Sequence, residues 1–315
     1  MTYNKLFKFD LQRFVKGDTL LERSDIAKAM YIGTKEVFKD VLKKNRREEW
    51  KACCSIKKST GMEETYETIG NLKPAAIKLE GDPVVYGDIV DGNDVVLTNV
   101  TVANGLSVTM EANEDEKWGI VPTGKTTELA RTMLQYRERA VATVWDGVEV
   151  NIGGDGVPNA SLAHPLLNNQ ALFNSNLVPG AFGTVTYELA CNLFNGWMNH
   201  TGEKFDTLPT TILSHRNRQT EVLALLQSQL VAFELSNTKN TLQQLKPVFN
   251  RYIAALPVHI IDDTIDSVVF QRRKGLTTEY DYDKRLTFNW FFNVHERYVC
   301  GVINPGFGFV TITGA

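Results

Sequence analysis

The segment best suited by residue type and spacing to do chemistry spans residues 119–126. It reads GIVPTGKT and matches G-x-x-x-x-G-K-[ST], the pattern of a phosphate-binding loop. In such a loop backbone amides surround the phosphates, Lys125 contacts the β- and γ-phosphates, and Thr126 holds magnesium. The apolar run Val258–Ile261 ends at Asp262, as a strand with a magnesium-binding aspartate would. The pattern raises the alternative that the chain is a P-loop NTPase that acts through Gly119–Thr126.

The residues before this segment argue against a nucleotide site. A phosphate-binding loop follows a buried strand, yet five of the eight residues at 111–118 are charged. Unpaired charges in a buried parallel strand would cost several kcal/mol, and the acidic ones would repel phosphate. A regular alternation of strands and helices is also absent. We therefore expect an ordinary turn and the start of a helix at Gly124–Thr127.

Other residues with catalytic or metal-binding chemistry are scattered along the chain. The five histidines show no H-x-x-x-H or H-E-x-x-H spacing, and no G-x-S-x-G pattern occurs. Asp262, Asp263 and Asp266 have no base near them in sequence, so a solvated turn is the better interpretation. We predict no catalytic, cofactor-binding or metal-binding residue, and we expect the protein not to be an enzyme. The histidines are His164, His200, His215, His259 and His295.

The composition is that of a globular chain that buries a sizeable core. Of 315 residues, 43% are apolar and 23% are charged, which excludes a disordered or fibrous protein. The net charge of -3 argues against a protein whose main task is to coat nucleic acid. Four cysteines make no disulfide framework. Charged residues interrupt the apolar N-terminal ones, so we expect neither a signal peptide nor a membrane partner.

The first 112 residues read as an arm, a helical region and a loop-rich region. In the arm, residues 1–20, Phe7 and Phe9 alternate with charged residues and Phe14 follows. Such aromatic residues seek a surface, either on their own domain or on another copy. Residues 21–55 read as a helix region, and turn signals crowd residues 56–112. Within these, Asn104-Gly105 between alternating runs predicts a hairpin turn.

The rest of the chain mixes long helices with many strands. Helical spacing predicts a helix over 124–146 with the stripe Leu129, Met133, Tyr136, Ala140 and Val144 buried. A second helix, over 184–199, would bury Val185, Leu189, Leu193 and Trp197. A third would carry apolar residues between 222 and 233. Strands are expected near 210–213, 247–253, 258–261, 268–270, 286–292, 298–302 and 307–312, the second at a sheet edge because of Pro247. The pattern indicates the α+β class.

Several segments resemble one family. Residues 155–158 (DGVP), 163–165 (AHP) and 174–177 (NSNL) resemble the "DG-x-P…HP…SNL" run of Mu-like major head subunits. The order of helix, glycine turn, proline-led strand and helix that follows is similar to the axial domain of tailed-phage major capsid proteins. The opening at residues 5–14 is similar to coat-protein starts from phages of Gram-positive hosts, and residues 285–308 resemble the closing strands of the same family.

The resemblance implies a division of the chain. Residues 1–20 would be the N-terminal arm, 21–55 an N-terminal helix region, and 56–112 an extended β-hairpin loop over the adjacent subunit. Residues 113–149 and 266–315 would form the peripheral domain with the long spine helix, and 150–265 the axial domain. The implied intersubunit contacts are Phe7, Phe9, Phe14, Val84, Val85, Tyr86, Val100 and Val102.

The function implied by the resemblance is that of a major capsid protein. Many copies, as hexamers and pentamers, would close an icosahedral shell around phage double-stranded DNA, which they would contact only non-specifically. The expected location is the virion capsid, assembled in the host cytoplasm. No long charged helical segment precedes residue 20, so we expect a separate scaffolding protein, with a portal as a further partner. An encapsulin-like nanocompartment shell, which shares the fold, is the other alternative.

Overall fold

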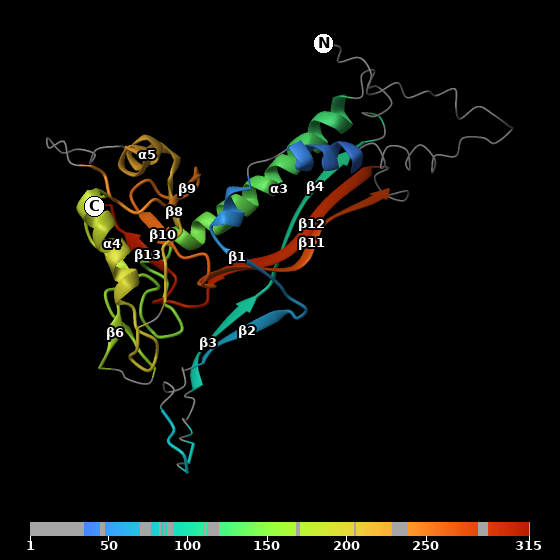
Figure 1. The fold of residues 1–315 in the computed structure, drawn as a ribbon. Coiled ribbons are helices and arrows are strands. Elements are labelled where there is room, and N and C mark those ends of the chain that lie inside the picture. The colour runs from blue at the N-terminus through green and yellow to red at the C-terminus, as the bar shows by residue number, and fades with distance from the viewer. Residues whose placement is uncertain are drawn as a thin grey trace.

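The computed structural model describes most of the chain and bears out the α+β class. The predicted contacts Phe7, Phe9, Phe14 and Val85 lie outside the described residues. Two sheets, each covered by helices, make up the body, and a two-stranded ribbon leaves it (Figure 1). The described residues are 35–44, 48–69, 77–81, 83–84, 86, 91–109, 111, 120–167, 171–204, 206–228, 239–282 and 289–314.

The first sheet has four strands in the order β1-β11-β12-β4. They are β1 (Ser55–Lys58), β11 (Val268–Tyr282), β12 (Trp290–Val302) and β4 (Val100–Val108). Strand β1 runs parallel to β11, whereas the other pairs are antiparallel. The 3₁₀ turn η2 (Glu49–Ala52) leads into β1, and a helix over residues 35–44 packs Phe38 against Phe292 of β12.

The long helix α3 (Ile120–Asp146) lies along this sheet (Figure 1). It begins four residues before the expected start. Its buried face includes Leu129, Met133, Val141 and Trp145, but Tyr136 is 52% exposed, so this part of the predicted stripe is wrong. The true stripe follows i, i+4 steps from Leu129 through residue 137 to Trp145, which places Tyr136 beside the sheet rather than over it.

The second sheet has five strands in the order β7-β13-β10-β8-β9. Helices α4 (Thr184–Gly196) and α5 (Gln219–Gln227) contribute to its core. The predicted edge position of the proline-containing strand is confirmed, because β9 is the last strand in the order. The strands are β7 (Leu177–Val178), β13 (Phe309–Ile312), β10 (Val258–Ile261), β8 (Thr211–His215) and β9 (Lys246–Asn250).

Helix α4 buries a different face from the predicted one. Tyr187, Ala190 and Phe194 are buried together with the expected Trp197, whereas Val185 and Leu189 are exposed. The third predicted helix is shorter in the described chain, because α5 ends at Gln227 and residues 229–238 lie outside the description.

The two sheets meet at Trp145, near the end of α3. Its indole Nε1 donates to the Cys53 carbonyl at 3.2 Å, and its ring contacts His259 and Phe309 at centroid distances of 4.9 and 5.4 Å. His259 and Phe309 belong to the five-stranded sheet, and Cys53 precedes the four-stranded one. Strand β13 belongs to the segment 266–315, which we expect to form the peripheral domain together with the long helix. In the structure β13 pairs with β10 and β7 of the five-stranded sheet.

The ribbon consists of β2 (Glu63–Ile69) and β3 (Asp91–Thr98), which pair antiparallel and extend away from both sheets (Figure 1). The predicted hairpin turn at Asn104-Gly105 is wrong. Both residues lie inside β4, opposite Val294 and Asn293 of β12. At Gly105 a Cβ atom would lie 2.5 Å from the Asn293 side-chain oxygen, so a larger residue there would require that side chain to move. Among the described helices none is long and apolar enough to cross a membrane.

Candidate assembly interface

The tip of the ribbon carries exposed apolar side chains. Ile77 is 94% exposed and Tyr86 is 90% exposed, and Leu79 and Val84 are exposed as well. Burial of one such side chain is worth about 1.5–3 kcal/mol, so a group of them at the end of a projection favours contact with a second surface. Val84 and Tyr86 are among the predicted intersubunit contacts and remain predictions. The sequence reasoning missed Ile77 and Leu79, although apolar residues amid turn signals could have identified them.

The other predicted contacts, Val100 and Val102, lie at the start of β4. Val100 is 58% exposed, whereas Val102 is half-buried and packs against the core beneath α3. Together with Tyr136 and Arg139 of α3 they line an open groove of about 410 Å³ between the strand and the helix. A side chain that enters this groove would therefore meet both apolar and polar neighbours.

The ribbon is held to the four-stranded sheet by a small polar cluster. The Tyr66 hydroxyl donates to the side-chain oxygen of Gln271 at 3.0 Å. Gln271 is fully buried, and its amide nitrogen donates to the Leu97 carbonyl at 3.2 Å and to the Asn99 side-chain oxygen at 3.1 Å. Leu97 packs over Gly301, where a Cβ atom would lie 2.6 Å from a Leu97 methyl group. These contacts fix the base of the ribbon on β11 and β12.

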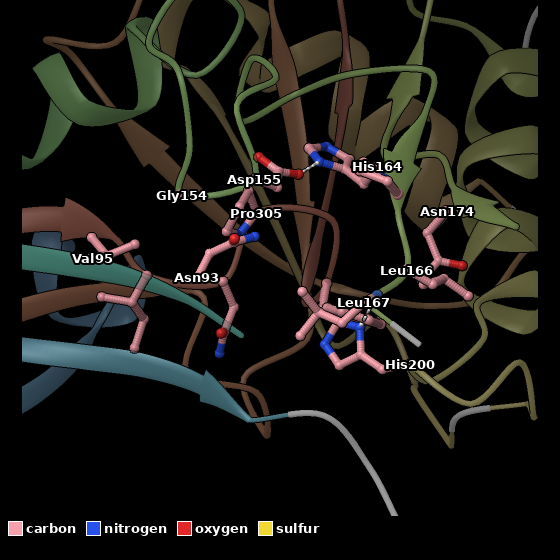
Figure 2. Close-up of a pocket in the computed structure, with 14 residues that line it drawn as sticks. Asn93, Val95, Gly154, Asp155, His164, Leu166, Leu167, Asn174, His200 and Pro305 are labelled. Carbon is pink, nitrogen blue, oxygen red and sulfur yellow. Dashed lines mark hydrogen bonds and ion pairs between the residues drawn. The ribbon is translucent and has the colours of Figure 1, made fainter. Parts of the chain in front are cut away.

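The ribbon has a second contact with the body, which we call the ribbon seat: the loop at Gly154 and Asp155 together with His164, in the segments that carry the family resemblance (Figure 2). His164 is buried, and its Nδ1 lies 2.6 Å from Asp155 Oδ2, an ion pair when the ring is protonated. The Asn176 side-chain oxygen accepts from the Ser161 amide at 2.7 Å, while its nitrogen donates to the Asn159 carbonyl at 2.7 Å. This fixes the amide orientation, so His164 Nε2 donates to Asn176 Oδ1 across 3.1 Å.

Two glycines bring this seat into contact with its neighbours. At Gly154 a Cβ atom would lie 3.0 Å from Val95 Cγ2 and 3.3 Å from Asn93 Cβ, both on β3. At Gly306, which has φ of +86°, a Cβ atom would lie 2.9 Å from the His164 side chain. Figure 2 shows Asn93 and Val95 beside the loop at Gly154. The loop at 153–155 therefore supports one side of the ribbon.

The P-loop alternative is not favoured by this structure. Helix α3 begins at Ile120, so the residues between the two motif glycines are already helical and their segment is no loop. Lys125 is exposed, but Thr126 is fully buried and its hydroxyl cannot reach a magnesium ion in solvent. Gly119 lies outside the described residues.

The expected partner strand also differs from that of an NTPase. Strand β10 is antiparallel to both of its neighbours. The Asp262 carboxylate accepts from the Leu208 amide and from the Thr264 amide, each at 2.9 Å. Asp262 therefore holds a turn closed. Within the described ranges, no group of three or more His, Cys, Asp or Glu side chains could hold a metal ion.

Glu138 joins three elements of the fold. Its Oε1 accepts from the Trp50 amide at 3.4 Å and its Oε2 accepts from Asn250 Nδ2 at 3.1 Å, which ties α3 to η2 and β9. Burial, with a smaller contribution from the negative charge of Glu49, raises the pKa of Glu138 to about 7.

Arg137 and Glu296 form a buried ion pair between α3 and β12. The Glu296 side chain is 1% exposed and that of Arg137 is 13% exposed. The guanidinium of Arg137 contacts Glu296 Oε2 and supplies the charge that compensates the carboxylate. The other oxygen, Oε1, has no hydrogen-bond partner among the described residues. The guanidinium also lies 5.6 Å from the centroid of the Trp50 ring. The pair fixes the helix over the sheet directly beside Val102, which is opposite Glu296 in the register.

Comparison with solved structures finds the same fold in phage capsids. The chain superposes on the capsid protein of the cyanophage P-SCSP1u with a TM-score of 0.55 at 10% identity, over 84% of this chain and 86% of that one. The capsid of a native GTA particle gives 0.55 at 10% identity, over 85% and 91%. The procapsid of bacteriophage JBD30 gives 0.51 at 14% identity, over 91% and 75%. No family model and no curated relative matches the sequence. The chain has the tailed-phage major capsid fold.

Proposed function

We propose that this chain is a major capsid protein whose copies assemble into a closed icosahedral shell of hexamers and pentamers. The observation that carries the proposal is the projecting β2–β3 ribbon with apolar side chains at its tip, Ile77 and Tyr86 above all. An isolated subunit gains nothing from such a projection. In a shell every copy offers the same tip to a neighbour, so its burial is repeated over the symmetric and quasi-symmetric interfaces.

The likeness in fold to three phage-type capsids supports the proposal and gives the ribbon a natural use. We propose further that the shell encloses phage double-stranded DNA, which its wall contacts without specificity. The net charge of -3 suits a container better than a DNA-coating protein. A scaffolding protein and a portal are proposed partners, and the host cytoplasm is the proposed place of assembly.

The proposal is tested by imaging the purified full chain, expressed alone and with a candidate scaffolding protein, by negative-stain electron microscopy. Closed particles are expected. Monomers and amorphous material under all conditions would contradict it.

Substitutions at the tip test the role of the ribbon. The variant Ile77→Ser/Tyr86→Ser should melt at the temperature of the unchanged subunit, because both side chains are exposed, but it should fail to form stable shells. Ile77→Val/Tyr86→Phe is the matched control, since it changes the same positions and keeps them apolar. Normal shells from the serine variant would show that the tip is not an intersubunit contact.

A further inference from the structure

A chain of hydrogen bonds in the ribbon seat runs from Asp155 through the ring of His164 to Asn176. Figure 2 shows the Asp155 carboxylate directed at this ring. Both ring nitrogens are engaged, because Nδ1 lies 2.6 Å from Asp155 Oδ2 and Nε2 lies 3.1 Å from Asn176 Oδ1. His164 is buried, so its ring protons must satisfy these two partners rather than bulk water.

The orientation of the Asn176 amide fixes the first ring proton. Its Oδ1 accepts from the Ser161 amide and its Nδ2 donates to the Asn159 carbonyl. A flipped amide would set donor against donor at one contact and acceptor against acceptor at the other. The nitrogen Nε2 of His164 must therefore carry a proton to bond with Oδ1. A neutral imidazole has only this one ring proton, which would leave a lone pair on Nδ1.

The short contact at Nδ1 requires a second proton. A lone pair on Nδ1 would repel the Asp155 carboxylate across 2.6 Å, whereas an N–H group donates to it. An ordinary histidine has a pKa of about 6.5 and an ordinary aspartic acid one of about 3.9, which places the shared proton on the nitrogen. The pair is thus a buried imidazolium beside a carboxylate.

No other charged side chain of the described residues lines the cavity at this pair. Its titratable lining residues are Asp155, His164 and His200. Burial lowers the pKa of His200, which keeps that ring neutral above the ordinary histidine value, and its Nδ1 accepts from the Leu167 amide at 3.4 Å. Strand β3 and the loop before β13 contribute only uncharged side chains to the cavity. The charge on His164 is therefore balanced by Asp155 alone.

This proton joins the loop under the ribbon to the rest of the body. The loop contacts β3 at Gly154, and its next residue, Asp155, is held by His164, which itself packs against Gly306. Loss of the proton would turn the bond between Nδ1 and Oδ2 into a repulsion. The loop would then move away from His164, and the ribbon would lose its support on this side.

We propose that the ribbon seat binds one proton, on His164, and that loss of this proton at higher pH releases the ribbon from the body. A free histidine loses the same proton above about pH 6.5, so above this pH the closed seat holds a proton that the open seat has lost. Closure is therefore favoured at lower pH and weakens as pH rises, by up to about tenfold for each pH unit.

Ring protons can be counted by NMR on the unassembled full-length chain with ¹⁵N-labelled histidine. At about pH 7.5, above the ordinary histidine value, we expect the His164 ring to carry a proton on both nitrogens. Its signals are identified by their absence from His164→Gln. Asp155→Asn is the decisive variant, because an asparagine amide can donate to an unprotonated Nδ1. In this variant we expect a closed seat and a ring with a proton on Nε2 alone.

Amide hydrogen exchange over residues 153–161 measures the opening of the seat, because the Gly153 and Ser161 amides are hydrogen-bonded within it. After correction for intrinsic exchange rates, protection in the unchanged chain should fall with rising pH by up to about tenfold per unit relative to Asp155→Asn. Glu138 titrates in both chains, so the difference between them isolates the seat.

Either of two results would overturn the proposal. One is a single ring proton on His164 in the unchanged chain at about pH 7.5, above the ordinary histidine value. The other is protection that changes equally with pH in both chains. Both readouts use the unassembled subunit, so the inference does not rest on the proposed function. A chain that never forms shells would refute that function and leave both readouts as expected here.

Discussion

The ion pair between Arg137 and Glu296 gives a quantitative prediction about what holds α3 on the sheet. Replacement of Arg137 by methionine keeps much of the side-chain volume but leaves the Glu296 carboxylate buried without a compensating charge. Removal of one partner of a buried pair costs about 3–5 kcal/mol. The lost contact with the Trp50 ring adds about 0.5–2 kcal/mol. We therefore expect Arg137→Met to lower the free energy of unfolding by about 4 kcal/mol or more.

The measurement is equilibrium unfolding of the unassembled subunit in urea, followed by tryptophan fluorescence. Arg131→Met is the matched control on the same helix, because Arg131 pairs with Glu128 where both side chains are more than 60% exposed. An exposed pair contributes at most about 1 kcal/mol. The double variant Arg137→Met/Glu296→Leu removes both charges, and most of the lost stability should return. A loss below about 1 kcal/mol for Arg137→Met, or a double variant no more stable than the single one, would refute this reasoning.

Three further predictions concern Glu138, the buried amide and the ribbon seat. Burial raises the pKa of Glu138 from 4.5 to about 7. Between pH 4.5 and about 7 the folded subunit therefore holds a proton on Glu138 that the unfolded chain has lost. Stability should therefore fall by about 1–2 kcal/mol as pH rises through this window, allowing for partial exposure, and Glu138→Gln should flatten the urea-unfolding profile against pH. Asn176→Ala leaves three buried or half-buried polar partners without their hydrogen bond to this side chain. It should lower the free energy of unfolding by about 3–5 kcal/mol in the same assay. Gly154→Val should displace the ribbon and reduce the shell yield in micrographs with little change in melting temperature. Adding Val95→Ala to this variant should restore the shell yield. The control Gly183→Ala, where a Cβ atom meets nothing within 4 Å, should leave the shell yield unchanged.

Features that depend on local chemistry were predictable from the sequence. The edge position of β9 follows from Pro247, which cannot donate a hydrogen bond to a neighbouring strand. Strand β10 was predicted with its observed bounds, Val258–Ile261, because a short apolar run fits one buried strand. The α+β class followed from the mixture of long helices and strands.

Features set by distant partners could not be predicted in this way. Asn104-Gly105 favours a turn in isolation, but β12 supplies a pairing partner along the whole of β4, and the register overrides the local preference. Val185 and Leu189 have helical spacing, yet α4 buries the face with Tyr187 and Phe194, because that side meets the five-stranded sheet. The seat at Asp155 and His164 was noticed as a family motif, while its contact with the ribbon needed the packing at Gly154.

The place of β13 in the five-stranded sheet bears on when a newly made subunit can associate. This strand lies between β7 and β10, so Thr311 pairs with both Leu177 and His259. A nascent chain that has not yet released residues 309–312 from the ribosome leaves an open gap between these strands and an uncovered apolar core. Closure of the sheet thus waits until residues 309–312 have been made, long after residues 177–178 of β7. A chain that has not reached this point lacks a finished surface, which delays association until β13 is in place.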